Sequence, residues 1–247
     1  MTADPVAEAA AADAAADVID LWTIATDQPP AVVRRLRGLL DREERDRADR
    51  AHDPVQGARF TVVRGAVRLL VADRLGTGAA DVVWQRGPHG KPAPVLSPGS
   101  GRTHVNWSAS GALAVLAVAD GRRVGADVEE IHPPGVGARI ARRHFPAPDA
   151  ALVLHAPTPA ESAERFTRLW CRREACVKVH GGRLAQGLGL ALAGPSPLRL
   201  AHAGALGPGP LWLADVRVPG PFHAAVAADV DRPFTVRQRG WVAPRLP

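Results

Sequence analysis

Three acidic residues on two separate segments are the residues of this chain best suited to do chemistry. Asp127 and Glu129 lie two positions apart in VGADVEE, and Glu174 lies in LWCRREACVKVHGGRL. Residues two apart on a β-strand point to the same face, so the first pair can share one surface. Lys178 follows Glu174 by four positions, one helical turn further along. The sequence therefore predicts a pocket that combines three carboxylates with one lysine.

Carboxylate oxygens in such a pocket are suited to a hard divalent cation such as Mg²⁺. This ion takes few protein carboxylates and leaves its other positions to water and substrate phosphates. Metal, acid and lysine around a phosphate group indicate phosphoryl-type transfer. The alternative interpretation of the same residues is a solvated acidic strand end and an ordinary helical ion pair between Glu174 and Lys178.

The elements that must position these residues are predicted to be a strand and a helix. Residues 113–118 and 124–129 are apolar strands, and the Asp120-Gly121 pair between them is typical of a hairpin turn. A helix is expected at 161–180, and the most regular helix at 56–75. The remaining expected helices are 30–40 and 136–144, and the remaining strands are 18–25, 82–86, 211–218, 222–230 and 234–241.

The length and composition predict one large domain or two lobes. The chain has 247 residues, of which 46% are hydrophobic, which is ample for a core. Residues 18–122 are predicted to form an N-terminal lobe and residues 123–247 a C-terminal lobe. The Ala- and Asp-rich residues 1–17 are predicted to be a disordered or weakly helical tail rather than a secretory signal. The segments 111–120 and 221–229 are loosely alike, which indicates duplicated halves.

The charge of the chain predicts anionic partners. The formal net charge is +6, and it comes almost wholly from arginine, since only Lys91 and Lys178 are lysines. Aromatic residues make up only 4% of the chain, so nucleic-acid binding is disfavoured. No apolar run is long enough to span a membrane. Cys171 and Cys176 lie five positions apart in one expected helix, which argues against a disulfide and indicates a reduced, cytoplasmic protein.

Four motifs in order carry a resemblance to a known family. GPHGKP, VNWSASG, VGADVEE and LWCRREACVKVHGGRL resemble motifs of the Sfp-type 4′-phosphopantetheinyl transferases, over roughly residues 18–241. The resemblance implies an α+β fold, a pseudo-dimer of two similar α+β lobes with the active site in the cleft between them. It also implies transfer of the 4′-phosphopantetheine arm of coenzyme A (CoA) to a serine of an apo acyl or peptidyl carrier protein. That reaction requires Mg²⁺ and releases adenosine 3′,5′-bisphosphate.

The resemblance also implies roles for individual residues. Asp127, Glu129 and Glu174 are expected to hold Mg²⁺. Glu174 is further expected to take the proton of the serine, and Lys178 to contact the transferring phosphate. The residues expected to bind CoA are Lys91 in GPHGKP, Ser108 in VNWSASG, Arg59 and Arg64 on the helix 56–75, and Arg47 in the charged stretch before it.

The chain departs from the family pattern at Ala109. The family usually has Ser-His-Ser where this chain has Ser108-Ala109-Ser110, so a histidine that helps to hold a CoA phosphate is missing. The loss of one charge-assisted hydrogen bond costs about 1.5–3 kcal/mol. We expect Trp107 or a nearby arginine to compensate.

These inferences favour a phosphopantetheinyl transferase that acts on acidic carrier proteins, as a monomer. One alternative is a catalytically impaired relative that still binds CoA or a carrier, with Ala109 as a first sign of decay. A second is a basic nucleic-acid-binding protein, which the low aromatic content disfavours. The carrier and its pathway, fatty-acid, polyketide or nonribosomal-peptide biosynthesis, stay open at this point.

Overall fold

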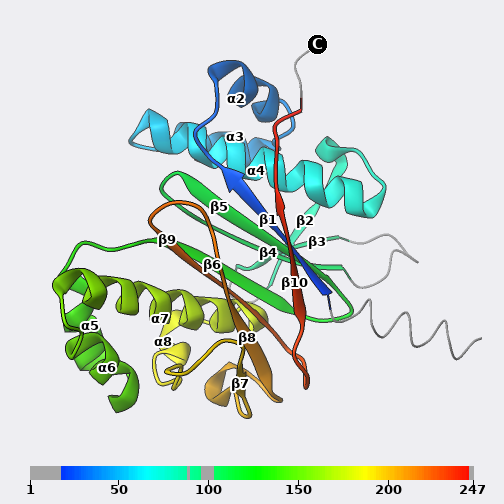
Figure 1. Ribbon diagram of the computed structural model, residues 1–247. Helices are drawn as coiled ribbons and strands as arrows, with labels where there is room; N and C mark the ends of the chain where they lie inside the picture. Colours follow the sequence, from blue (N-terminus) through cyan, green and yellow to red (C-terminus); the bar gives the residue numbers. More distant parts are fainter. Residues whose placement is uncertain (1–17, 88–89, 96–102, 245–247) are drawn as a thin grey trace, which may run out of the picture.

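The computed structural model describes residues 18–87, 90–95 and 103–244 of the chain. The predicted N-terminal tail, residues 1–17, lies outside the described residues (Figure 1). Within the described ranges, no helix is both long and apolar enough to cross a membrane.

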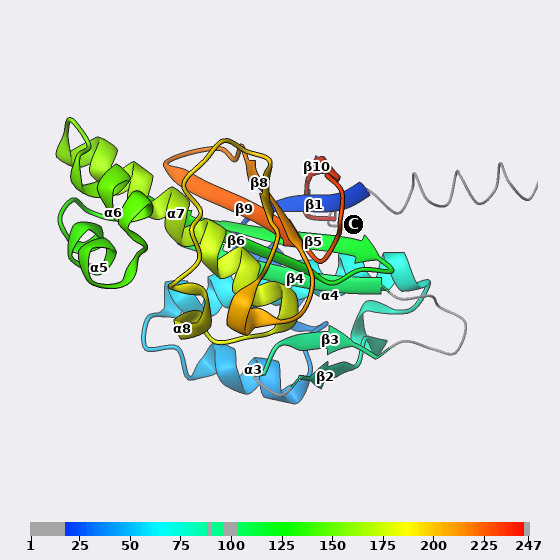
Figure 2. The same cartoon turned by 90° about the horizontal axis from the view of Figure 1, so that it is seen from below.

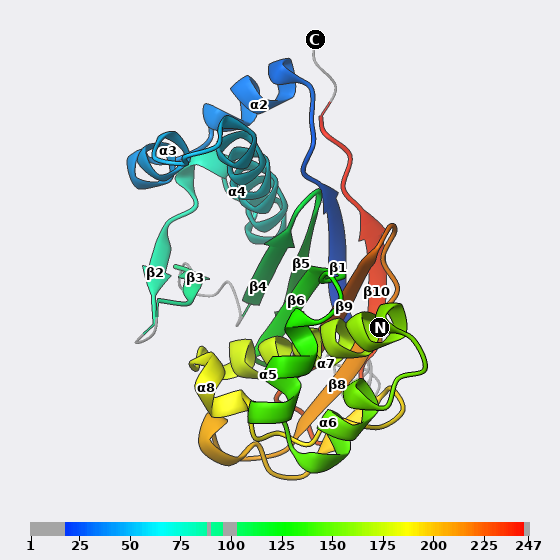
Figure 3. The ribbon, with the colours of Figure 1, turned by 90° about the vertical axis from the view of Figure 1, so that its left-hand side faces the viewer.

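Two four-stranded sheets pack face to face, and a long helix covers the outer face of each (Figures 1 and 3). Helix α4 (Pro54–Leu75) packs on the first sheet and helix α7 (Pro159–His180) on the second. This pair of similar α+β halves confirms the predicted fold class. The first sheet has the order β10 (Thr235–Gly240), β1 (Val18–Ala25), β5 (Leu113–Asp120), β4 (Thr103–Ser110), and the second β6 (Val124–Glu130), β9 (Phe222–Ala228), β8 (Leu211–Val216), β7 (Leu198–Leu200).

Strand β5 shows why the layers stack in this way. Val115 and Ala117 belong to the core between the two sheets, whereas Ala114 and Leu116 belong to the core under α4. Successive side chains of a strand alternate between faces, so a strand that is covered on both faces is apolar throughout. All four side chains are fully buried.

Strand β6 follows the same alternation with a different result. Val124, Ala126 and Val128 belong to the core between the sheets. The residues that alternate with them, including Asp127 and Glu129, therefore face the side on which α7 packs. The alternation thus turns Asp127 and Glu129 toward the helix that carries Glu174 and Lys178.

The hairpin predicted at Asp120-Gly121 is wrong. Strand β5 pairs with β1 and β4, whereas β6 pairs with β9 in the other sheet. Gly121 has a φ of 71°, and the chain crosses here from the first sheet to the second. A turn signal specifies only a local reversal of the chain, and the edges that pair are chosen by long-range burial.

The last strand of the described chain, β10, forms one edge of the first sheet. Strand β10 pairs in parallel with β1, from Val18 opposite Thr235 to Thr23 opposite Gly240. Strand β10 therefore belongs to the same sheet as β1, although its residues lie within the predicted range 123–247; the lobe limits stay a prediction. The two loosely similar segments form β5 and β9, each an inner strand of its sheet.

The two long helices have clear end signals. Helix α7 begins after Thr158, whose hydroxyl accepts a hydrogen bond from the Glu161 N–H at 3.1 Å, and ends at His180, where Gly181 caps it with a φ of 68°. Helix α4 begins after Asp53 and ends at Gly76. The shorter elements are α2 (Pro30–Arg37), α3 (Arg42–Asp49), β2 (Trp84–Arg86), β3 (Pro92–Pro94), α5 (Val136–His144), α6 (Ala147–Leu154) and α8 (Leu184–Gly187).

Candidate active site

A cavity of about 840 Å³ lies between the two halves of the molecule. One side of its wall comes from α3, α4, β4 and the β2–β3 segment, and the other from the C-terminal part of α7. These elements are seen together from below in Figure 2. Of the predicted site residues, only the two on β6, Asp127 and Glu129, are absent from the wall. The residues that line it are Arg47, Arg59, Arg64, Lys91, Ser108, Glu174 and Lys178.

Strand β4 joins the edge of β6 through side chains of one face. The Ser108 hydroxyl donates to Asp127 Oδ1 at 2.7 Å, and the Ser110 hydroxyl donates to Glu129 Oε2 at 2.8 Å. The Ala126 N–H donates to Asn106 Oδ1 at 2.8 Å. Asn106, Ser108 and Ser110 alternate along β4 and therefore point to one face. These hydrogen bonds fix β4, which lines the cavity, to β6, which carries Asp127 and Glu129.

Helix α7 places Lys178 against Asp127. Lys178 Nζ lies 2.6 Å from Asp127 Oδ1 and donates to the Ser108 hydroxyl at 3.0 Å. Asp127 is 1% exposed, buried behind the two residues that contact it. The close approach of α7 to β6 depends on Gly125, because a Cβ at this position would lie 2.0 Å from the Ala175 carbonyl oxygen.

The pKa values of Lys178, Glu174 and Glu129 are all shifted in this cluster. Burial pushes the pKa of Lys178 down, but the hydrogen bond to Asp127 and the negative charges of Asp127, Glu174 and Glu129 together outweigh it, and the pKa is raised above 10.5. Burial raises the pKa of Glu174, with a smaller contribution from repulsion by Asp127 and Glu129. The pKa of Glu129 is raised by burial and by the Asp127 charge. The four groups therefore share one electrostatic neighbourhood.

The donor chemistry of this neighbourhood fits a divalent metal. Asp127 Oδ2 is buried and has no hydrogen-bond partner, and a carboxylate oxygen of this kind is a normal ligand of Mg²⁺. The described residues contain no group of three or more His, Cys, Asp or Glu side chains already arranged around a metal-sized gap. In this structure the cation held by Asp127 is the Lys178 ammonium.

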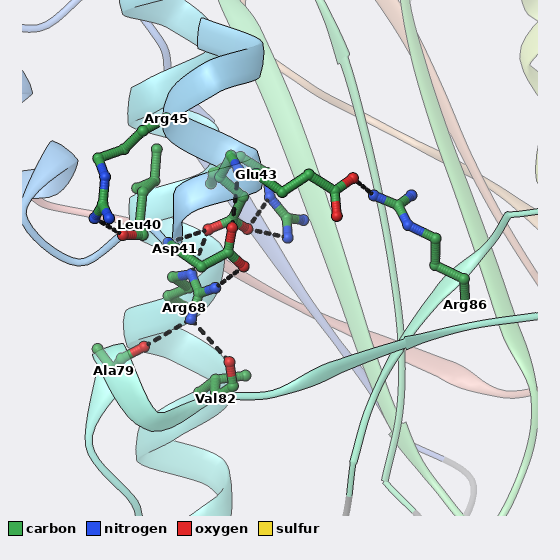
Figure 4. A network of polar contacts seen from close by, with 10 residues as sticks. Leu40, Asp41, Glu43, Arg45, Arg68, Ala79, Val82 and Arg86 are labelled. Carbon is green, nitrogen blue, oxygen red and sulfur yellow. Dashed lines mark hydrogen bonds and ion pairs between the residues drawn. The ribbon is translucent and has the colours of Figure 1, made fainter.

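The opposite wall of the cavity contains a buried network of ion pairs (Figure 4). Glu44 on α3 pairs with Arg64 and with Arg68, whose Nε lies 2.6 Å from Glu44 Oε2. Asp41 pairs with Arg68 at 2.7 Å and also caps α3. All three members of the Glu44 pairs are less than 9% exposed. Glu44 therefore compensates two buried arginines, and sequence reasoning did not single it out.

The predicted phosphate-binding arginines are already engaged in protein contacts. Arg64 donates from Nε and Nη2 to Glu44, and its guanidinium lies 4.5 Å from the ring centre of Trp107. Arg59 forms two hydrogen bonds with Asp27, of 2.7 and 3.0 Å. These contacts fix the orientation of both guanidinium groups at the cavity wall.

The other residues of the expected CoA site are also located by the structure. The Arg47 guanidinium lies 5.0 Å from the ring centre of Phe60. Ala109 is exposed in the cavity wall, at the position where the resemblance led us to expect a histidine. Lys91 lines the cavity, but its ammonium donates to backbone carbonyl oxygens.

Comparison with known proteins points to one family. Residues 123–202 match the 4′-phosphopantetheinyl transferase superfamily. The chain is 30% identical over 191 residues to the 4′-phosphopantetheinyl transferase HetI of Nostoc sp., covering 76% of this chain and 79% of HetI. It is 28% identical to the 4′-phosphopantetheinyl transferase psf-1 of Bacillus pumilus, over 63% of this chain and 64% of the relative. A 4′-phosphopantetheinyl transferase of Bacillus subtilis is also 28% identical, over 61% of this chain and 64% of the relative. This similarity, which extends over most of the chain, makes the protein a member of the 4′-phosphopantetheinyl transferase superfamily.

Proposed function

We propose that the protein transfers the 4′-phosphopantetheine arm of CoA to a serine of an apo acyl or peptidyl carrier protein. The main structural support is the position of Lys178, which contacts Asp127 and Ser108 in the cavity wall that also contains Glu174. Membership of the superfamily supports the same reaction.

The cavity suits CoA in size and charge. A volume of about 840 Å³ is within the range of cofactor pockets, roughly 300–1,000 Å³. Arg47, Arg59 and Arg64 supply positive charge on one wall and Lys178 on the other. We assign the phosphates of CoA to this space, since guanidinium and ammonium groups are the usual partners of phosphate oxygens.

The reaction breaks one bond of the CoA pyrophosphate and forms one bond to the carrier serine. The serine Oγ attacks the β-phosphorus, its proton passes to the Glu174 carboxylate, and adenosine 3′,5′-bisphosphate leaves. Lys178 holds the transferring phosphate by its positive charge. When bound by Asp127, Glu129 and Glu174, Mg²⁺ would supply positive charge to the pyrophosphate oxygens.

The carrier is expected to approach the mouth of the cavity as an acidic partner. The chain has a formal net charge of +6, which favours encounter with an acidic surface. We propose that a monomer is the active unit, since both faces of the cavity come from one chain. A cytoplasmic location fits the location of CoA and carriers.

A mass measurement on the carrier tests this proposal. The protein is incubated with apo carrier, CoA and Mg²⁺, and the carrier should gain the mass of one phosphopantetheine group. A panel of fatty-acid, polyketide and nonribosomal-peptide carriers identifies the pathway. Omission of Mg²⁺ with added chelator should stop the reaction. Tight CoA binding without any mass gain across the panel would support the catalytically impaired relative instead.

A further inference from the structure

The ammonium group of Lys91 is held by backbone carbonyl oxygens of the other half of the molecule. Its Nζ donates to the Val124 carbonyl at 2.8 Å, to the Val179 carbonyl at 3.3 Å and to the Lys178 carbonyl. An ammonium group has three donors, so these three acceptors use all of them. The side chain comes from the β2–β3 segment, whereas its acceptors lie on β6 and α7.

Two of the acceptors lie at the C-terminal end of α7. The last four carbonyl groups of a helix have no intrahelical partner and carry the negative end of its dipole. Lys178 and Val179 are among them, because the helix ends at His180. The Lys178 carbonyl also accepts a hydrogen bond from the capping Gly181 N–H at 3.3 Å, so the buried cation adds to the helix cap there and supplies a donor to the Val179 carbonyl.

The third acceptor lies on the strand that carries the acids. Val124 is the first residue of β6, three positions before Asp127. Lys91 therefore connects β6 to the end of α7, close to the point where Lys178 Nζ contacts Asp127 at 2.6 Å. The Lys178 carbonyl oxygen thus accepts a hydrogen bond from Lys91, while the Lys178 ammonium forms the ion pair with Asp127.

The backbone of Lys91 is itself fixed. Its carbonyl oxygen accepts a hydrogen bond from the Gly87 N–H at 2.9 Å, within the β2–β3 segment. Gly181, with a φ of 68°, leaves room for the lysine stem, since a Cβ there would lie 3.3 Å from Lys91 Cβ. The side chain is thus enclosed between a tight turn and the end of α7.

We propose that Lys91 is a positioning residue, whose ammonium ties β6 to the C-terminal end of α7 and so holds Lys178 against Asp127. This inference rests on the proposed transferase function. It gives Lys91 a role distinct from the CoA contact expected from the sequence, because all three of its donors are used by the protein. Loss of the tie should misplace Lys178 and slow the chemical step rather than weaken CoA binding.

Lysine side-chain NMR of the wild-type protein tests the tie directly. Because Lys91 and Lys178 are the only lysines of the chain, selective lysine labelling gives two side-chain signals, which a Lys91→Arg variant assigns. We expect the Lys91 ammonium protons to exchange slowly in the free protein and its signal to stay unchanged when CoA is added, while the Lys178 signal shifts. Fast exchange, or a large CoA-induced shift of the Lys91 signal, overturns the proposal.

Kinetics of Lys91→Met and Lys91→Arg complete the test. For Lys91→Met we expect kcat to fall about 10²-fold, with KM for CoA within about threefold of the wild type, and Lys91→Arg to recover part of kcat. Arg42→Met is the matched control, since it removes one positive charge from a side chain that is 92% exposed. A tenfold or larger rise in KM at unchanged kcat contradicts the positioning role. If the wild type transfers nothing to any carrier, the proposed function fails, whereas slow exchange at Lys91 still reports the tie.

Discussion

Lys178 Nζ and Asp127 Oδ1 lie 2.6 Å apart, and this pair joins the two elements that carry the candidate catalytic residues. The lysine comes from α7 and the aspartate from β6, and Asp127 is 1% exposed. A buried carboxylate depends strongly on its partner, because desolvation disfavours its charged form. The pair therefore links the stability of the fold to the geometry of the site.

Removal of Lys178 is expected to affect both stability and transfer. Lys178→Met leaves the Asp127 carboxylate without its cation, which should cost about 3–5 kcal/mol of unfolding free energy. The double variant Lys178→Met with Asp127→Asn should recover stability but not transfer. Urea denaturation and the carrier mass assay measure the two quantities. A double variant no more stable than Lys178→Met would contradict a dominant role for this pair.

Replacement of Glu174 should remove transfer and leave the fold intact. Glu174→Gln keeps the size of the side chain but cannot take the serine proton, so we expect kcat to fall by about 10²–10⁴-fold. Stability should change little, because burial disfavours the charged carboxylate in the wild type. Glu164→Gln, at an exposed position of the same helix, is the control. Robust turnover by the Glu174 variant would refute its assignment.

The close packing of α7 on β6 predicts a strong effect at Gly125. A Cβ there would lie 2.0 Å from the Ala175 carbonyl oxygen and 2.7 Å from the Val179 nitrogen, so Gly125→Ala must push the helix away. We expect a loss of about 1–3 kcal/mol in unfolding free energy together with reduced kcat. Gly189→Ala is a suitable control, since a Cβ there has nothing within 4 Å. Equal stability of the two variants would mean that the packing is less tight than described.

The pKa of Lys91 predicts a pH dependence of stability. Burial lowers this pKa from 10.5 to about 8, while the Asp229 charge opposes the shift and Arg123 and Lys178 add to it. Between pH 8 and 10.5 the unfolded chain binds more protons at this residue than the folded chain, so its contribution to the unfolding free energy rises with pH. Urea midpoints at about pH 7.5 and about pH 10 give the difference in unfolding free energy between the wild type and Lys91→Met. From the lower to the higher pH, this difference should shift in favour of the wild type. A constant difference would show that the lysine stays charged throughout.

The exposed position of Ala109 predicts a gain of CoA affinity. Ala109→His places an imidazole in the cavity wall, where the resemblance implies a phosphate contact. An added charge-assisted hydrogen bond of about 1.5–3 kcal/mol lowers KM for CoA by about tenfold or more. Ala112→His, outside the cavity wall, is the control. An unchanged KM would mean that position 109 is not a missing contact.

Several elements were predictable from the sequence because their signals are local. Helices α4 and α7 were expected from apolar spacing and from Gly76 and Gly181 at their ends, and the structure extends each by two residues at the start. The period of two along β6 is a local property of the strand, and it suffices to put Asp127 and Glu129 on one face. The motif order identified the family, which the comparisons confirm.

Other features depend on partners that lie far away in the chain. Glu44 lies in a run of charges that is typical of a solvated surface, yet it is buried because Arg64 and Arg68 from α4 meet it there. The parallel pairing of β10 with β1 has no local signal, since either edge of the sheet satisfies the same backbone groups. The sequence by itself determined which side chains could do the chemistry and which local elements carry them. Only the tertiary structure decided that Lys91 donates to main-chain carbonyls and that Lys178 holds Asp127, because burial and long-range contact select among partners of equal local chemistry.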